Sequence, residues 1–320
     1  MPDKILPKII SKFTLANALC NSGDYEEALP LFDKAIKSDP LNYAIYEAKG
    51  DAYLYLEQYL KAISEYKKAL DLCPNDYLSP LINELKRKLL ADIDELKNRN
   101  KFKKALELAL PLRKYFLKDA EVLCLISDLY SSMEQYTIAI DLFKECLTLK
   151  ITKQNEKYIL FNLIYCMYCL ELYEECIGLC KKLKERYDDI FIDFKMANCY
   201  EAMHDTFNSE KYYDIAVKKI LKMDDEVIKD YANVIIDLIK SSIKQKNHNR
   251  QILLSKLYIN KISKNPIAMI DLAEAYKEIG KYKEAIRVFE KTADYYSNDD
   301  AGEYAKEQIE MCKKLKDGLR

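Results

Sequence analysis

The stretch NSGDYEEALPLFDKAIKSDPLN, residues 21–42, is followed by a second copy of its own pattern. When it is placed over YLEQYLKAISEYKKALDLCPND, residues 55–76, five positions match, and every match is 34 residues apart. The matched pairs are Tyr25 with Tyr59, Ala28 with Ala62, Phe32 with Tyr66, Ala35 with Ala69, and Pro40 with Pro74. A fixed period of this length indicates a repeat architecture in which each repeat packs on its neighbours.

The spacing within one copy predicts a helix. An aromatic residue, a small residue at +3, an aromatic at +7 and a small residue at +10 lie on one helical face. The small side chains allow another helix to approach, and Pro40 ends the helix before the next repeat. A second helix precedes each such helix, as in AIYEAKGDAYLYL, residues 44–56. Two helices per repeat, stacked in series, predict an all-α fold, a right-handed α-solenoid.

The pattern recurs along the chain and predicts a single solenoid over residues 1–320. Further copies are Phe102/Ala105, Tyr136/Ala139/Phe143 and Tyr282/Ala285/Phe289, with degraded copies at Tyr173/Cys176/Cys180 and Ser209/Tyr213/Ala216. We place eight helix pairs at 9–42, 43–76, 86–119, 120–153, 157–190, 190–223, 225–262 and 266–299, and a polar capping helix at 300–317. Residues 77–85 lengthen one helix by about two turns. Residues 225–246 are expected to form one overlong helix.

The chain resembles the tetratricopeptide repeat (TPR) family. In addition to the residues above, the resemblance is carried by Leu15, Ala16, Leu19 and Gly23 in the first copy, Tyr46, Gly50 and Tyr53 in the second, and Leu272, Ala273, Tyr276 and Gly280 in the last. It implies a concave surface lined by the first helix of each pair. It also implies a protein-binding role without catalysis or a cofactor.

Composition narrows the class of partner and the compartment. The 51 basic and 52 acidic residues leave a net charge of −1, which argues against nucleic acid or an anionic membrane as the main partner. The start, MPDKILPKII, lacks a signal-peptide core, and the longest apolar segment is shorter than the ~20 residues of a membrane span. Ten cysteines without a signal favour free thiols in a reducing compartment, so we expect a cytoplasmic protein.

No residue pattern indicates catalysis. His204 and His248 are expected in turns without triad partners, and the six glycines are too scattered for a phosphate-binding loop. Cys166-x-x-Cys169 followed by Cys176-x-x-x-Cys180 resembles a metal-binding cluster. Cys176 and Cys180 occupy core positions of the repeat, however, so we interpret these cysteines as packing residues and expect no metal.

A helix that is apolar on every side suggests the binding site. In YILFNLIYCMYCLELY, residues 158–173, one stripe matches the repeat core, and a second aromatic stripe about 120° away is expected to face the groove. The residues predicted to bind a partner are Tyr158, Phe161, Asn162, Tyr165, Tyr168, Phe191, Phe194 and Asn198. The alternative is that the chain's own helices or a second copy cover this aromatic patch.

Earlier first helices place carboxylates in the same predicted groove. These residues are Glu47, Asp51, Asp94, Glu121 and Asp128, which we call the acidic wall. Such a wall would steer a basic segment of a partner, whereas the alternative is an ordinary solvated face. TPR co-chaperones hold the C-terminal carboxylate of Hsp70 or Hsp90 with Lys, Asn and Arg side chains. Asn17 matches that clamp, but Phe13, Ala48 and Ala91 replace three of its members, so this tail is disfavoured as a partner.

Two functional hypotheses follow. The first is a non-enzymatic adaptor that holds a peptide or a partner's helix in the concave groove. Aromatic residues would anchor the bound segment, asparagines would hold its backbone, and the acidic wall would set its orientation. The second is a structural subunit whose surfaces are permanently buried in an assembly or a homo-oligomer. The sequence does not determine the oligomeric state or the partner.

Overall fold

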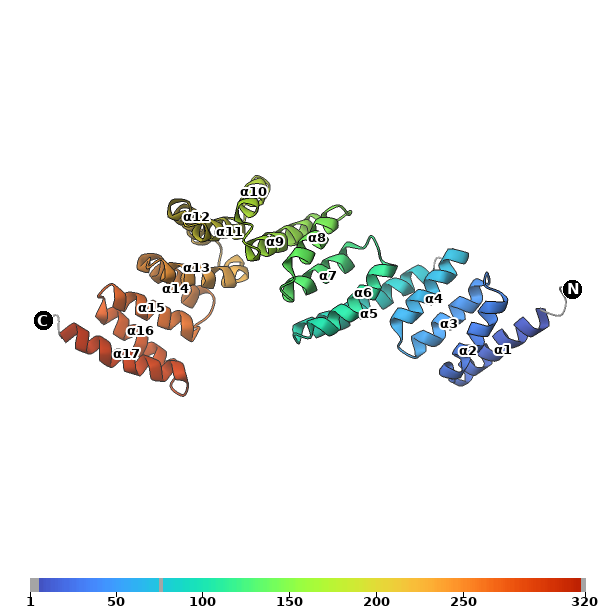
Figure 1. Cartoon of the computed structure of the whole chain (residues 1–320). Coiled ribbons are helices and arrows are strands. Elements are labelled where there is room, and N and C mark those ends of the chain that lie inside the picture. Colours follow the sequence, from blue (N-terminus) through green and yellow to red (C-terminus); the bar gives the residue numbers. More distant parts are fainter. Residues whose placement is uncertain (1–5, 75–76, 318–320) are drawn as a thin grey trace. The chain divides into compact units, whose positions relative to one another are not determined.

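The computed structural model describes residues 6–74 and 77–317, with side chains from residue 12 onward. Over these residues the protein is all-α, with seventeen α-helices, one 3₁₀-helix and no strand. The all-α solenoid class predicted from the repeat is confirmed, because within each of the two units described below nearly all helices adjacent in sequence pack on one another (Figure 1). The last two residues of the second predicted pair, 75–76, lie outside the described residues.

The chain forms two compact units, residues 1–170 and 171–320, which we treat separately. Unit 1 contains α1–α9. Their bounds are α1 Leu6–Ser22, α2 Tyr25–Ser38, α3 Tyr43–Tyr55, α4 Tyr59–Leu72, α5 Leu78–Asn98, α6 Phe102–Tyr115, α7 Ala120–Ser132, α8 Tyr136–Leu147 and α9 Lys153–Cys169. At 21 residues, α5 is the longest of them, which agrees with the lengthening expected from residues 77–85.

Unit 2 contains α10–α17 and the 3₁₀-helix η1. Their bounds are α10 Tyr173–Lys184, α11 Ile190–Ala202, α12 Thr206–Ile220, η1 Val227–Tyr231, α13 Ala232–Lys244, α14 His248–Lys261, α15 Pro266–Glu278, α16 Tyr282–Tyr295 and α17 Asp300–Asp317. The expectation of one long helix over 225–246 is wrong. A 3₁₀ turn, the tighter winding often found at helix starts, precedes α13 and buries Ile228 in the core. The capping helix is present as α17.

The repeated small and aromatic positions form the core. Ala28, Phe32, Ala62, Tyr66 and Phe289 are all fully buried. In the second pair, a small residue on the first helix makes room for a large one on the second, because a Cβ added at Gly50 would lie 2.5 Å from Cε1 of Tyr66. The alternation of large and small side chains therefore sets how closely the helices of a pair approach.

The turn inside each helix pair has the same backbone conformation. Of the eight such turns in the described residues, each has one residue with positive φ. They are Gly23, Glu57, Asn100, Glu134, Glu171, His204, Lys246 and Gly280. In seven of these eight described turns, the next N–H donates a bond of 2.8–2.9 Å to the carbonyl five residues earlier. This is the Schellman arrangement that ends a helix with a left-handed residue.

Candidate functional site

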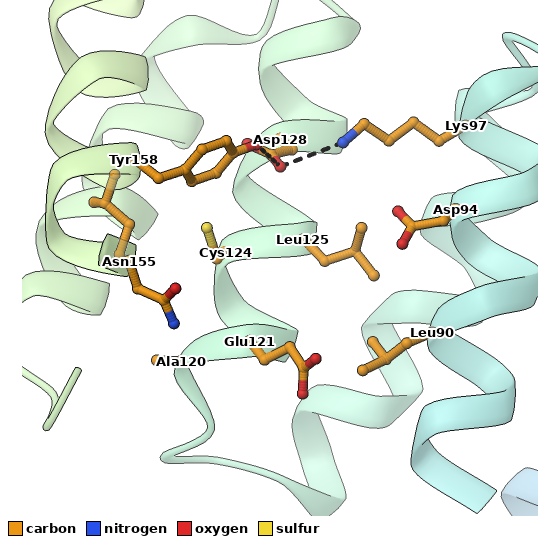
Figure 2. A pocket seen from close by; sticks show the side chains of 11 residues that line it. Leu90, Asp94, Lys97, Ala120, Glu121, Cys124, Leu125, Asp128, Asn155 and Tyr158 are labelled. Carbon is orange, nitrogen blue, oxygen red and sulfur yellow. Dashed lines mark hydrogen bonds and ion pairs between the residues drawn. The ribbon is translucent and has the colours of Figure 1, made fainter. Parts of the chain in front are cut away.

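A groove in unit 1 lies between the first helices of three successive pairs, α5, α7 and α9. Figure 2 shows the side chains that line its cavity of about 500 Å³. Leu90, Leu125 and Ile159 give it an apolar floor, because each occupies an inward position on its helix. The polar side chains at its edge are Asp94, Lys97, Glu121, Cys124, Asp128, Asn155 and Tyr158. We call this site the α5–α7–α9 groove.

A hydrogen-bonded chain of three side chains crosses the groove. The Tyr158 hydroxyl donates to Asp128 Oδ2 at 2.6 Å, and Lys97 Nζ donates to the same oxygen at 3.3 Å (Figure 2). Burial raises the pKa of Asp128, while the bonds from Tyr158 and Lys97 act in the opposite direction. Burial and the Asp128 carboxylate together raise the pKa of Tyr158, so this hydroxyl remains a donor at neutral pH.

The acidic wall differs in part from its predicted form. Asp94, Glu121 and Asp128 line the groove, as expected for positions on one face of first helices. Two of the three are in ion pairs. Glu121 pairs with Lys86 at 2.9 Å, where Lys86 also pairs with Asp119 at 2.8 Å, and Asp128 pairs with Lys97 at 3.3 Å. In the part of the chain that the structure describes, Asp94 has no ion-pair partner. Asp94 is therefore the groove carboxylate whose charge no described lysine or arginine offsets by a direct contact.

The other two predicted wall residues lie on α3 and do not line this cavity. The Tyr66 hydroxyl donates to Asp51 Oδ1 at 2.7 Å, so this carboxylate is bonded to the core of its own pair. Burial raises the pKa of Asp51, and burial together with the neighbouring Asp51 charge raises that of Glu47. The five carboxylates thus do not form one continuous cavity wall.

The aromatic stripe of α9 extends the groove. A second cavity, of about 340 Å³, shares Lys97, Asp128 and Tyr158 with the first and adds Asn162 and Tyr165. Tyr165 is 42% exposed, and its ring meets Tyr136 edge-on with the centroids 6.2 Å apart. Asn162 Nδ2 donates to the Tyr158 carbonyl within the helix at 3.1 Å.

Phe161 and Tyr168 are half-buried and line neither of these cavities. Lys157 Nζ lies 5.3 Å from the centroid of the Phe161 ring. The three remaining predicted residues, Phe191, Phe194 and Asn198, belong to α11 in unit 2.

Phe194 was predicted to face the groove, and the structure contradicts this. It is 3% exposed and packs against Tyr213, with the ring centroids 6.3 Å apart, inside the core of unit 2. Asn198 Oδ1 accepts a hydrogen bond of 2.8 Å from the Tyr213 hydroxyl. Phe191 is half-buried, with Lys195 Nζ 5.3 Å from its ring centroid. On α11 the apolar residues surround the helix, and Phe194 belongs to the side that faces its partner helix.

Of the four cysteines in the metal-like sequence cluster, three are buried and Cys169 is half-buried. Cys176 and Cys180 are fully buried in unit 2, where the Cys176 thiol is hydrogen-bonded to Cys180 and to Cys199. Cys166 is buried in unit 1, with its Sγ 3.3 Å from Ser131 Oγ. Among the residues with described positions, no three His, Cys, Asp or Glu side chains come together as a metal site. The participation of Cys199 was not predicted, because it lies on a different helix.

The residues that the sequence interpretation missed include Lys97 and Asn155, which line the groove, and Lys86, which lies outside the lining but pairs with Glu121. Lys86 and Lys97 lie on α5, and Asn155 at the start of α9 projects into the cavity (Figure 2). The signal for the two lysines was available, because Lys86 and Glu121 are 35 residues apart and Lys97 and Asp128 are 31 apart, both close to the repeat period. No described helix is both long and apolar enough to cross a membrane.

Comparison with known proteins places the repeats in a family. Tetratricopeptide repeat models match residues 13–77, 120–150 and 268–301. Tetratricopeptide repeat protein 21A of Mus musculus is 25% identical over 89% of this chain. A STIP1 homolog of Dictyostelium discoideum is 37% identical over 18% of this chain. The chain spans 22% of the first relative and 10% of the second.

The solved structures that match this chain include the TPR domain of P58(IPK). It covers 98% of this chain and 99% of its own, with 16% identity and a TM-score of 0.35. The pilus biogenesis factor PilW covers 68% of this chain and 95% of its own, with 15% identity and a TM-score of 0.37. On the repeat period, the buried small and aromatic positions and the three matching segments, this chain is a tetratricopeptide repeat protein.

Proposed function

We propose that this protein is a non-enzymatic scaffold whose α5–α7–α9 groove holds a peptide or helix of a protein partner carrying a basic side chain. The observation that carries the proposal is Asp94, an exposed carboxylate at the edge of an apolar cavity and without an ion-pair partner among the described residues. A Lys or Arg beside it would gain a charge-assisted hydrogen bond. The neighbouring aliphatic positions of the partner would cover Leu90, Leu125 and Ile159.

Other groove residues have roles that follow from their chemistry. Tyr158 and Tyr165 are 45% and 42% exposed, and each presents a large rigid ring, the kind of side chain that dominates binding energy at interfaces. The side-chain amide of Asn155 can donate and accept, which suits a peptide backbone. Lys86 and Lys97 pair with Glu121 and Asp128, which leaves Asp94 as the unpaired carboxylate of the groove, so a partner with a single basic residue fits better than a polybasic one.

Selection from a random peptide display library on the purified full chain tests this role. We expect selected peptides to share a Lys or Arg flanked by apolar residues. Asp94→Lys should weaken their binding by about tenfold, the equivalent of ~1.4 kcal/mol. Asp92→Lys is the matched control, because Asp92 is exposed on the same helix but does not line the groove.

Three outcomes would count against the proposal. Selected peptides without a basic residue would contradict the role of Asp94, as would equal binding by both variants. An obligate oligomer in light scattering, with no peptide selected, would favour the structural-subunit hypothesis instead. Circular dichroism of each variant shows that a loss of binding is not a loss of fold.

A further inference from the structure

A second groove, in unit 2, lies between α14, α15 and α16. Two adjoining cavities of about 500 and about 480 Å³ share Ile259, Asn260, Met269 and Lys291. Two of these three helices are the second members of their pairs, so this site is built from different repeat positions than the α5–α7–α9 groove. We call it the α14–α15–α16 groove.

The floor of this groove is apolar. Met269, Leu272 and Tyr276 on α15 are 4%, 6% and 8% exposed and close the bottom of the groove. Ile259 and Val288, both half-buried, form its two sides. A bound side chain would therefore exchange water for aliphatic contacts, which favours an apolar anchor.

The rim of the groove is predominantly cationic. Lys256 lies on α14, Lys264 lies in the turn after it, and Arg287 and Lys291 lie one turn apart on α16. All four are exposed, and over residues 6–74 and 77–317 none of them makes an ion pair. The rim carboxylates are Glu284 and Asp294, so cations outnumber anions by four to two.

Two of the cations are already oriented by aromatic rings. Lys264 Nζ donates to the Tyr295 hydroxyl at 2.8 Å and lies 4.7 Å from the centroid of that ring. Lys256 Nζ lies 5.3 Å from the centroid of the Tyr276 ring. These contacts reduce the rotamer freedom that each ammonium group would lose on binding an anion.

We propose that the α14–α15–α16 groove binds an acidic segment of a protein partner, with an apolar side chain on the floor and carboxylates at the cationic rim. Charge complementarity favours an acidic segment, because the four cations at the rim have no ion-pair partner among the described residues and the apolar floor offers them no carboxylate. The cations are distributed over three parts of the chain around an apolar strip. This distribution suits carboxylates spaced along a peptide better than one compact phosphate.

The probe is a fluorescein-labelled synthetic peptide in which Glu alternates with Leu and Phe, titrated into the full chain and followed by fluorescence polarisation. Two control peptides accompany it. In one, Lys replaces every Glu; in the other, Ser replaces every Leu and Phe. We expect the first peptide to bind, the two controls to bind at least about tenfold more weakly, and the affinity to fall as salt is added.

Charge reversal locates the binding. Arg287→Glu and Lys291→Glu should each weaken the acidic peptide by about tenfold or more. Lys283→Glu is the matched control, because Lys283 is exposed on the same helix but does not line the groove. The variants change exposed side chains only, so circular dichroism should match the parent.

The proposal is overturned if the acidic peptide does not bind, or if Lys283→Glu weakens it as much as the groove variants do. Equal binding of the Ser-substituted peptide would also overturn it, because the groove would then recognise charge alone, as a polyanion site does. This test is independent of the α5–α7–α9 groove, since Asp94→Lys should leave the acidic peptide's affinity unchanged.

Discussion

The Tyr158 hydroxyl donates a 2.6 Å hydrogen bond to Asp128, and this bond ties α9 to α7 at the edge of the α5–α7–α9 groove. The Asp128 side chain is only 12% exposed, so water cannot fully replace a lost donor. Tyr158→Phe should therefore lower the free energy of unfolding by about 1 kcal/mol. Hydrogen exchange measured by mass spectrometry should localise the change to peptides of α7 and α9.

Tyr43→Phe is the control for this change. Tyr43 is 40% exposed at the start of α3, and no partner of its hydroxyl is seen among the described residues. Its removal should leave exchange and the unfolding temperature unchanged. If the two variants behave alike, the bond between Tyr158 and Asp128 contributes nothing to holding these helices together.

The contact between Gly50 and Tyr66 predicts that alanine substitutions at two helical glycines will change stability in different ways. An added Cβ at Gly50 would lie 2.5 Å from a ring that is fully buried, and the hydroxyl of that ring is bonded to Asp51. Gly50→Ala should cost roughly 1–3 kcal/mol of stability, as overpacking does. At Gly178, also helical, nothing lies within 4 Å, so Gly178→Ala should be neutral or stabilising by up to about 1 kcal/mol. Thermal unfolding followed by circular dichroism compares them, and equal melting temperatures would contradict this packing.

Truncation of two aromatic residues distinguishes core from groove. Phe194→Ala should lower the free energy of unfolding by roughly 3–5 kcal/mol, because Phe194 is buried against Tyr213. Tyr165→Ala should lower it far less, because Tyr165 is 42% exposed. Tyr165→Ala should instead weaken the binding of peptides selected on the α5–α7–α9 groove. Urea unfolding and peptide titration report the two quantities. A Phe194→Ala protein that unfolds like the parent would show that this ring is not part of the core.

Asp271 makes stability depend on pH. Burial, together with the nearby Glu274 charge, raises the pKa of Asp271 to about 6. The unfolded-state value is about 3.9, so the fold favours the protonated form. The protonated Asp271 carboxyl therefore contributes its full share of stability below pH ~4, and this share is lost as the pH rises through about 6. Asp271→Asn keeps the neutral form and should be more stable than the parent at pH 7, by about 1 kcal/mol once solvent screening is allowed for.

The melting temperatures of parent and Asp271→Asn should converge at pH 4, where the parent carboxyl is protonated. Asp214→Asn on the exposed side of α12 should show no such convergence, because it should not differ at pH 7. If the melting temperatures of Asp271→Asn and the parent differ as much at pH 4 as at pH 7, the titration of Asp271 does not cause the difference.

The helices and their core could be predicted because one period repeats in both sequence and space. Matched small and aromatic positions such as Ala28 and Tyr66 are buried in their own pairs. The groove was predicted in part for the same reason, since Asp94, Glu121, Asp128 and Tyr158 lie on first-helix faces that helical spacing identifies.

The rest could not be predicted, for reasons specific to each residue. On α11 apolar side chains occur on every face, so periodicity does not distinguish the groove side from the core side, and Phe194 was misplaced. The spacing of Lys86 and Lys97 from their carboxylates was a signal in the sequence, but whether each ion pair forms depends on helix separation and side-chain length. The 3₁₀ turn before α13 follows from how Ile228 reaches the core, which helical spacing does not reveal.

The left-handed turns have a consequence for how such a chain diverges. The reversal inside a pair is held by main-chain hydrogen bonds, so it survives the loss of glycine at a local cost of roughly 1–2 kcal/mol. Glu57, Glu134 and Lys246 carry that cost where Gly23 and Gly280 do not. Since each repeat contacts only its neighbours, such substitutions can accumulate one repeat at a time without unfolding the whole array. The fold can therefore persist in repeats that no longer match the sequence pattern. Glycine placed at these turns is a route to a more thermostable variant.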